Sequence, residues 1–528
     1  MTIKSLNPLD ASWLMVESRD TPMHVGGLLR FSLPDDAPAD FFRRLMEDFR
    51  SVRYFAAPWN QRLRARSLAH PLPCWEDEHD IDLEHHVRHS SLPAPGGERE
   101  LGQLIARLHS QPLDLARPPW ECEVIEGLAD KQFALYVKMH HSLIDGIGSI
   151  KLLEKAMSAD PKASRKLQPF WAIGIDGGSK KPKREKRPPP TPAEAIGSLI
   201  EMVRGQIGSV PDIARAFGSM IGALRNKTDT LAIPFDTPMS IINGRIHGPR
   251  RFATQRFELD RLKRLAQAAG ATLNDVVLAL CGGALRRFLV ELGELPDKPL
   301  TAGIPVSVRP KDDEGTGNAI TFIISTLGTD IDDPRERLDA IGVSTRRAKQ
   351  HVQSLPKSAM TQYTVLLMAP YMLSLVTGVG GRTRPMFNVT ISNVPGPDKP
   401  LYFRGAKLEA AYPVSLVTHG QALNITCQSY NGHLAFGFTG CRDTLPHMQR
   451  VATYTGLALE ELEKAVFGAP AKPMRKRALA KPNAVVTAAA PASAAKLKRI
   501  RKKPDAATQE ADAMARSSTR AARTRAKA

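Results

Sequence analysis

Residues 172–195 divide the sequence into two sections, and this division most limits how the chain can fold. The segment is rich in glycine, proline and lysine and contains the run KKPKREKRPPP, a composition typical of a solvent-exposed linker. At 528 residues the chain also exceeds what one hydrophobic core usually supports. We therefore expect an α/β protein with two domains, or one large double domain.

The first section alternates strand-like and helix-like segments. Residues 26–33 have the pattern of a strand, and 40–52 and 99–111 have the apolar spacing of helices. Residues 120–128 and 131–140 are β-type runs separated by a turn-sized gap, which predicts a hairpin. A histidine doublet ends the second strand of this hairpin, and the residues after it look like a loop that opens a helix.

The second section begins near Arg251 and again combines strands and helices. A long apolar helix is expected over 272–292, starting at a threonine N-cap. Strands are expected at 252–259, 300–310, 319–330, 387–397 and 434–441, and further helices at 260–270 and 445–467.

These patterns predict a domain organisation. The amphipathic stretch 196–225 can pack between domains or lie against a lipid surface, and packing between domains is favoured. The tail is rich in alanine, lysine and arginine and cannot build a core. The expected parts are an N-terminal half at 1–171, a basic linker at 172–195, a helical crossover at 196–250, a C-terminal half at 251–467 and a disordered basic tail at 468–528.

The net charge of +19 is concentrated in two short segments. Residues 470–528 hold 16 lysines and arginines against three acids, and residues 180–187 hold six basic residues and one acid. The rest of the chain is therefore almost neutral. This distribution argues against a basic fold surface that binds nucleic acid. The tail is expected to be a solvated extension, and weak attraction to anionic lipid headgroups is the alternative.

The cysteines and apolar stretches indicate where such a chain works. Five scattered cysteines without a CxxC pair favour a reducing cytosol over a disulfide framework or a metal ribbon. The N-terminus lacks the apolar core of a signal peptide. The most apolar run, residues 364–381, contains Pro370 and is too short for a spanning helix. A buried helix is expected there, and a membrane-facing segment is the alternative.

The sequence HHSLIDG, residues 140–146, predicts base catalysis without a covalent intermediate. A neutral imidazole can take a proton from a substrate hydroxyl while that oxygen attacks a carbonyl carbon. Asp145 follows His141 by four residues and can brace the loop through a basic partner. Gly146 allows a tight turn beside the site.

HHSLIDG also resembles the HHxxxDG signature of the CoA-dependent acyltransferase superfamily, which includes chloramphenicol acetyltransferase and peptide-synthetase condensation domains. Five further blocks resemble, in order, the bacterial wax ester synthase/diacylglycerol acyltransferase family. These blocks are residues 7–28, PPW at 118–120, TLNDVV at 272–277, PVSVRP at 305–310 and NVTISNVPGP at 388–397. The resemblance covers residues 6–467. PPW departs from the PLW that is common in the family, which leaves the role of that turn in doubt.

The resemblance implies two chloramphenicol-acetyltransferase-like halves, each a mixed sheet flanked by helices, with an active-site tunnel between them. Acyl-CoA would enter from one side and the alcohol from the other. His141 is the expected general base, and His140 is either a supporting neighbour or a packed residue at the strand end. Asp145 is expected to be structural and paired with an arginine, for which Arg309 is the candidate.

The other family blocks supply candidates for support of the site. Asn274 and Asp275 match the ND block, where Asn274 can donate to the site or, more simply, cap the following helix. Asn393, Pro395 and Gly396 are expected to shape a turn that lines the tunnel.

Three other patterns suggest weaker alternatives. His79, His85, His86 and His89 lie among carboxylates, but their spacing matches no common zinc pattern, and alternation along a strand would separate neighbours. The glycines of GIGS at 146–149 lack dinucleotide-binding spacing. Ser142 is adjacent to the base, but adjacency in sequence does not create a nucleophile–base pair. We therefore expect no metal site and no nucleotide cofactor.

The predicted function is an O-acyltransferase that moves a fatty acyl group from CoA to a fatty alcohol or diacylglycerol. Acyl-CoA is a co-substrate in this reaction, and no cofactor is expected. The predicted location is the cytoplasm, with possible contact with a membrane face or a lipid inclusion. Two alternatives remain: a related acyltransferase with another acceptor or a carrier-protein thioester, and a non-enzymatic lipid-inclusion coat protein.

Overall fold

The fold was analysed in a computed structural model of the full chain. The structure describes residues 3–6, 8–64, 73–144, 146–174, 234–307, 320–353 and 377–468, together with residues 367, 368, 371, 374 and 375. The amphipathic stretch at 196–225, nearly all of the predicted linker, most of the predicted crossover and the tail beyond Gly468 lie outside these residues. The apolar run at 364–381 is described only in part.

The first of two six-stranded sheets is mixed, in the order β12-β13-β2-β7-β6-β5. Strands β2, β7 and β6 pair antiparallel, and β5 adds to β6 in parallel. The strands are β2 (His24–Ser32), β5 (Val87–Ser91), β6 (Trp120–Leu128), β7 (Gln132–His140), β12 (Tyr402–Phe403) and β13 (Ala406–Val414). The hairpin expected from the sequence is confirmed as β6 and β7.

The second six-stranded sheet has the order β10-β9-β11-β14-β15-β8 and is also mixed. Strand β11 is parallel to both β9 and β14, whereas the other pairs are antiparallel. Its strands are β8 (Arg250–Glu258), β9 (Thr301–Ser307), β10 (Ile320–Thr326), β11 (Val389–Val394), β14 (Leu423–Tyr430) and β15 (His433–Cys441). A separate three-stranded sheet joins β1 (Ile3–Ser5), β4 (Cys74–Asp77) and β3 (Gln61–Leu63).

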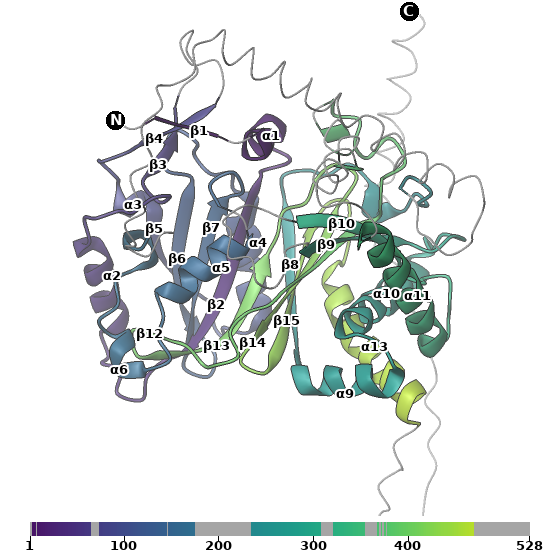
Figure 1. The fold of residues 1–528 in the computed structure, drawn as a ribbon. Helices are drawn as coiled ribbons and strands as arrows, with labels where there is room; N and C mark the ends of the chain where they lie inside the picture. Colours follow the sequence, from purple (N-terminus) through teal and green to yellow (C-terminus); the bar gives the residue numbers. More distant parts are fainter. Residues whose placement is uncertain are drawn as a thin grey trace, which may run out of the picture. The chain divides into compact units, whose positions relative to one another are not determined.

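Helices flank both sheets (Figure 1). Those of the first section are α1 (Pro8–Val16), α2 (Phe41–Ser51), α3 (Leu83–His86), α4 (Glu98–Ser110), α5 (Gly146–Lys155) and α6 (Pro161–Ser164), with a short 3-10 turn η1 (Phe170–Ala172). Those of the second are η2 (Ile241–Asn243), α9 (Leu259–Ala269), α10 (Leu273–Leu292), α11 (Pro334–Gln353) and α13 (Gln449–Phe467). Helix α10 begins at the predicted threonine, because the Thr272 side chain accepts a hydrogen bond from the Asp275 backbone.

Two strands from the second half of the sequence complete the first sheet. Strand β13 pairs antiparallel with β2 from Lys407 opposite Ser32 to Val414 opposite Gly26. In Figure 1 the green strand β13 lies beside the purple strand β2. Pairing between residues nearly 400 positions apart leaves no local signal, so the sequence analysis did not predict this exchange. It ties the two halves together through backbone hydrogen bonds.

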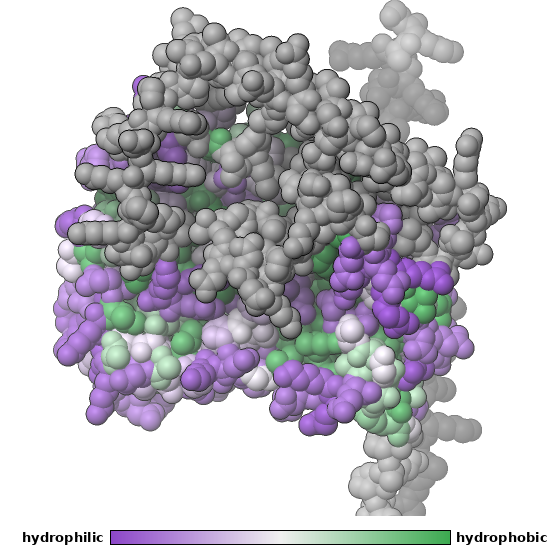
Figure 2. All heavy atoms as spheres, in the orientation of Figure 1, coloured by the Kyte–Doolittle hydropathy of each residue, from purple (hydrophilic) through white to green (hydrophobic). Residues whose placement is uncertain are grey.

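The described apolar side chains form two main cores and two smaller clusters, one of which contains Ile324, Met386 and Phe387. One core surrounds α10 in the second half, and another lies between the first sheet and α2. The other smaller cluster joins α4 to β13 and β15. On the face shown in Figure 2, the visible residues are largely hydrophilic with small hydrophobic patches between them, as is usual for a folded protein.

No single helix in the described ranges is long and apolar enough to cross a membrane. Helices α9 and α10 reach that length and composition only as a pair, across a bend of 98°. Most of α10 is buried in the core of the second half.

Candidate functional site

Backbone hydrogen bonds fix the histidine doublet at the end of β7. The His140 backbone N–H donates to the Pro119 carbonyl at 2.9 Å, so the PPW block holds the strand end in place. The His141 backbone N–H donates to the Met23 carbonyl at 2.8 Å. The Leu143 backbone N–H donates to the His140 carbonyl at 3.0 Å. The doublet therefore lies on a turn that is held by two other family blocks. This contact gives PPW a structural role despite its departure from PLW.

The His140 side chain is 0% exposed and engages both of its ring nitrogens. Nδ1 accepts from the Ser142 backbone N–H at 3.2 Å and lies 2.5 Å from Ser142 Oγ. Nε2 lies 3.3 Å from the Glu17 carboxylate. Because Nδ1 accepts a backbone hydrogen bond, the proton is on Nε2 and points to Glu17. These contacts hold the buried His140 ring in one orientation within the turn.

Glu17 is the residue at this site that the sequence analysis missed. Its Oε2 also accepts a hydrogen bond from the Met23 backbone N–H, and the Met23 carbonyl in turn holds His141. Glu17 therefore connects both histidines to the loop that follows α1. The available signal was a lone carboxylate directly after the apolar run Trp13–Val16, inside a block that resembles the family.

His141 is half-buried, and its ring lies against an indole ring. The Trp13 and His141 ring centroids are 4.5 Å apart with planes inclined by 33°. This contact limits the orientations available to the His141 ring while part of the side chain stays accessible. The neighbouring Asp145 lies outside the described residues, and Gly146 is the first residue of α5, as expected for a loop that opens a helix.

Buried polar groups continue along the same face of β7 as His140. The Lys138 ammonium lies 3.0 Å from the Glu121 carboxylate and donates to the Leu108 and Gln111 carbonyls at the end of α4. Burial lowers the pKa of Lys138. These bonds compensate for the removal of a charge from water and fix α4 against the strand.

His109 joins this polar face to the second half. Its Nδ1 lies 2.7 Å from the Tyr136 hydroxyl and its Nε2 lies 2.9 Å from the Ser415 carbonyl. Burial lowers the pKa of His109 to about 3. Because Ser415 offers only a carbonyl acceptor, the neutral ring carries its proton on Nε2 and accepts from Tyr136. This bond therefore ties the end of α4 to the residue directly after β13, the strand that the second half of the sequence adds to the first sheet.

The ND block forms the start of α10. Asp275 is buried and closes a capping box with Thr272, and its other oxygen accepts from the Thr345 hydroxyl at 2.6 Å. Asn274 is half-buried in the first turn, so the cap is made by Thr272 and Asp275 rather than by Asn274. The proposed role of Asn274 as a donor to the site stays a prediction.

The other candidates lie in the second half. Asn393 is half-buried in β11, Pro395 is exposed just after this strand, and Gly396 donates its N–H to Ser429 Oγ at 3.0 Å. A Cβ atom on Gly396 would lie 2.2 Å from the Ser429 carbonyl oxygen, so this turn requires glycine. Arg309 lies outside the described residues. The structure thus brings the doublet and Glu17 together, while the described contacts of Asp275 and Gly396 are with their own half.

The histidines between 79 and 89 have structural contacts. The segment is not one strand, because His85 and His86 lie in α3. His86 stacks on Trp120 and its Nδ1 donates to the Trp120 carbonyl at 2.7 Å, while His89 lies 3.6 Å from the Glu126 carboxylate. Across the described ranges, no three His, Cys, Asp or Glu side chains are grouped as a metal site.

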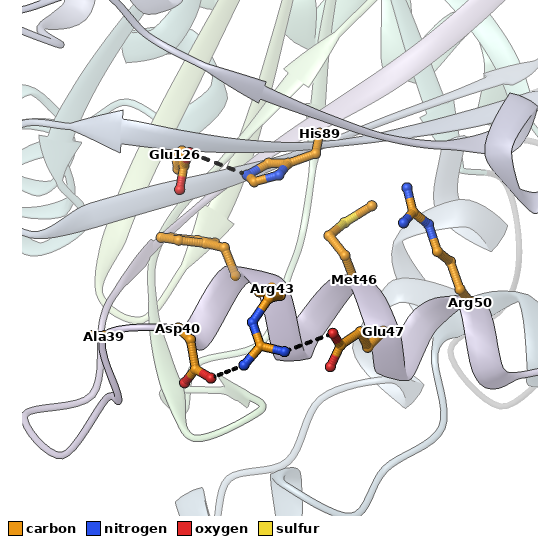
Figure 3. A pocket seen from close by; sticks show the side chains of 9 residues that line it. Ala39, Asp40, Arg43, Met46, Glu47, Arg50, His89 and Glu126 are labelled. Atoms are coloured by element: carbon orange, nitrogen blue, oxygen red, sulfur yellow. Dashed lines mark hydrogen bonds and ion pairs between the residues drawn. The ribbon is translucent and has the colours of Figure 1, made fainter.

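A cavity of about 410 Å³ lies between α2 and the neighbouring strands β5 and β6 (Figure 3). Most of its charged side chains pair with one another: Arg43 bonds to Asp40 and Glu47, and His89 faces Glu126. The residues of α2 pack on the face of the sheet that carries Val137 and Met139, which is opposite to the His140 face. This cavity is therefore separate from the doublet. The expected tunnel at His141 stays a prediction.

Comparison with protein family models shows which family this chain belongs to. The family model of the wax ester synthase/diacylglycerol acyltransferase catalytic domain matches residues 6–277, and the model of the WS/DGAT C-terminal domain matches residues 316–463. The chain belongs to the wax ester synthase/diacylglycerol acyltransferase family. It is an acyltransferase, and both the resemblance and the enzyme class predicted from its motifs are confirmed.

Individual relatives agree with this membership. A Mycobacterium tuberculosis protein that carries the provisional name diacylglycerol O-acyltransferase is 46% identical over 497 residues, which is 88% of this chain and 98% of that protein. The O-acyltransferase WSD of Acinetobacter baylyi is 38% identical over 453 residues, with 86% and 95% covered.

Solved structures confirm the predicted two-domain α/β fold. The wax ester synthase/diacylglycerol acyltransferase from Marinobacter aquaeolei VT8 superposes with a TM-score of 0.70 at 37% identity, over 88% of this chain and all of that one. The first condensation domain of the calcium-dependent antibiotic synthetase gives a TM-score of 0.53 at 16% identity, over 89% and 97%. The second likeness concerns the fold alone.

Proposed function

We propose that this acyltransferase moves a fatty acyl group from acyl-CoA to the hydroxyl of a fatty alcohol or diacylglycerol, with His141 as the general base. The observation that carries this proposal is the contrast within the doublet. His140 is sealed with both ring nitrogens engaged, whereas His141 is half-buried on the same rigid turn. We therefore assign the base to His141, because this residue stays partly accessible whereas His140 is buried. The names of a relative and of a solved structure, diacylglycerol O-acyltransferase and wax ester synthase/diacylglycerol acyltransferase, support the two acceptor classes.

The proposed reaction is a direct transfer. A His141 ring nitrogen takes the hydroxyl proton as the acceptor oxygen attacks the thioester carbonyl carbon, because neutral imidazole cannot ionise an alcohol in advance. The tetrahedral species then collapses, the carbon–sulfur bond breaks, and the CoA thiolate takes the proton from the imidazolium. Acyl-CoA enters as a co-substrate and leaves as free CoA, and the reaction requires no redox change or metal.

The supporting residues have positioning roles in this proposal. Glu17 and Ser142 hold His140, and His140 holds the turn that presents His141. Asp145 braces the same turn through Arg309, in line with the family resemblance. Trp13 restricts the His141 ring. A fixed ring lowers the entropic cost of bringing base and hydroxyl together.

The proposed place of work is the cytoplasm, in peripheral contact with a membrane face or lipid inclusion. All five cysteines are free and buried, which suits a reducing compartment. The basic tail supplies charge that anionic headgroups attract.

The test is the release of CoA from palmitoyl-CoA by the purified full-length protein, with hexadecanol or dipalmitoylglycerol as acceptor. We expect release that depends on an acceptor, with ester formed in equal amount. Without acceptor, a direct transfer gives no rapid burst of one CoA per enzyme. A stoichiometric burst would show a covalent acyl-enzyme and contradict the mechanism, and transfer only from acyl-carrier thioesters would contradict the donor.

A further inference from the structure

A second cavity, of about 330 Å³, lies in the second half of the protein. Its lining includes Tyr371, Ser374, residues from 377 to 386 and the loop at 419–421. Its lining is mainly apolar and includes Tyr371, Val379 and Met386. Arg245 holds its rim, because the guanidinium donates to the Gly378 carbonyl at 2.7 Å. A cavity of this size, with a mainly apolar surface and several polar side chains, is typical of a site for a small molecule or for part of a lipid.

One lining residue has an unused hydrogen-bond donor. Gln421 is 6% exposed, and its Oε1 accepts from the Thr390 hydroxyl at 3.0 Å. Its Nε2 is buried and has no hydrogen-bond partner within the described structure. Flipping the side-chain amide would place its NH₂ group beside the Thr390 hydroxyl. The amide oxygen of Gln421 would then lack a hydrogen-bond donor. A buried amide of this kind is costly unless another molecule supplies the missing acceptor.

The surface next to the cavity suits an apolar ligand. Phe235 and Val379 line the cavity and are 42% and 39% exposed, which is high for large hydrophobic side chains. Phe235 also has a φ angle of +67°, a strained conformation for a residue with a bulky side chain. Arg384 lies in the same lining and is exposed. Hydrocarbon can therefore enter past exposed apolar side chains.

Hydrogen bonds link the wall of this cavity to the loop that holds His141. His419 lines the cavity and accepts from the Ile246 backbone N–H at 3.1 Å, and Arg250 donates to the nearby Gly248 carbonyl at 3.0 Å. Arg250 donates to the Asp20 carbonyl at 2.7 Å, and Asp20 belongs to the loop that also carries Glu17 and Met23. The loop that holds His141 is thus coupled to the cavity wall.

We propose that this cavity binds the acyl-ester portion of a diacylglycerol acceptor, with Gln421 Nε2 donating to an ester carbonyl oxygen. This inference rests on the proposed function, because the acceptor hydroxyl is assigned to His141. A simple fatty alcohol has no second oxygen, whereas diacylglycerol carries two ester carbonyls. Because Nε2 is buried, donation to a ligand in the cavity requires rotation about the last side-chain torsion of Gln421, and this torsion is broad in glutamine. Gln421 then favours diacylglycerol over a simple alcohol.

The experiment compares three acceptors that differ at the proposed contact. Dipalmitoylglycerol has ester carbonyls, dihexadecylglycerol has ether oxygens in their place, and hexadecanol has neither. Gln421→Met removes the donor in a similar shape, and Gln421→Glu removes it while keeping an acceptor for Thr390. Gln255→Met is the matched control, since Gln255 lies in β8 and donates to the Ala452 carbonyl instead.

We expect both Gln421 variants to raise KM for dipalmitoylglycerol by roughly three- to tenfold, the usual effect of losing one hydrogen bond. KM for dihexadecylglycerol and hexadecanol stays unchanged, and Gln255→Met changes none of the three. A uniform loss with all three acceptors, or an unchanged diester-to-diether ratio, would overturn the proposal.

Failure of the underlying function gives a different result. In that case the unsubstituted protein releases no CoA with any acceptor, and equilibrium binding of radiolabelled dipalmitoylglycerol and dihexadecylglycerol decides the inference instead. Tighter binding of the diester by the unsubstituted protein, lost in Gln421→Met, supports the cavity assignment. Equal binding of both lipids contradicts it.

Discussion

Replacing Glu17 by glutamine tests whether His140 positions the catalytic turn. One Glu17 oxygen accepts from both the Met23 backbone N–H and His140 Nε2. Glutamine has one neutral carbonyl oxygen in place of the carboxylate, and its NH₂ group cannot accept a hydrogen bond. At least one of the two hydrogen bonds should therefore weaken. A hydrogen bond to a charged group contributes about 1.5–3 kcal/mol. If half or more of this energy orients the turn, kcat falls roughly four- to 160-fold.

The assay pairs kcat for CoA release with the urea midpoint of unfolding. We expect Glu17→Gln to lower both, with a fall in kcat that persists at temperatures where the variant is fully folded. Glu294→Gln is the matched control, because Glu294 is exposed after α10. A Glu17→Gln protein that is less stable but has full kcat per folded molecule would refute positioning and leave Glu17 only a structural role.

Three further predictions concern the frame around the site. Burial lowers the pKa of His86 to about 4, so this group contributes stability that is complete above pH 6.5 and lost as pH falls toward 4. His86→Asn should remove up to about 3 kcal/mol of that acid sensitivity, measured as urea midpoints at pH 7 and pH 4.5; an unchanged pH dependence would contradict it. A Cβ on Gly282 would lie 2.3 Å from the Leu327 carbonyl oxygen, so Gly282→Ala should destabilise the protein by about 1–3 kcal/mol, whereas Gly342→Ala in α11 should not, by thermal unfolding; equal effects would refute the packing argument. Asp275→Ala removes the capping box and the hydrogen-bond acceptor of Thr345, so it should lower the free energy of unfolding by about 2–4 kcal/mol. KM for palmitoyl-CoA should stay unchanged in the folded fraction. A selective rise in that KM would give the ND block a role in binding.

Local patterns predicted those elements whose signals lie within about 20 residues. The β6–β7 hairpin follows from two apolar runs and a short gap, and α10 follows from a threonine cap before a long apolar stretch. The HHSLIDG turn was recognised in the same way, because its residues are consecutive. Motif order then predicted the family and the two-domain fold.

Contacts between distant residues could not be predicted in this way. Glu17 and His140 are 123 positions apart, and β13 pairs with β2 across nearly the whole chain. The partner of a carboxylate or the neighbour of an edge strand depends on tertiary packing, which no spacing rule expresses. The proposed pairing of Asp145 with Arg309 would also join residues far apart in the sequence, and it stays a prediction.

The most direct test of the central claim is kcat for acyl transfer by His141→Ala, with His79→Ala as the control. His79 is exposed, so its loss should leave turnover and stability unchanged. Removal of a general base lowers rates by about 10²–10⁴-fold. The account predicts a fall of this size in ester formation by His141→Ala, with an unchanged urea midpoint. Turnover within about threefold of the unsubstituted protein would contradict it, since a general base contributes far more than that.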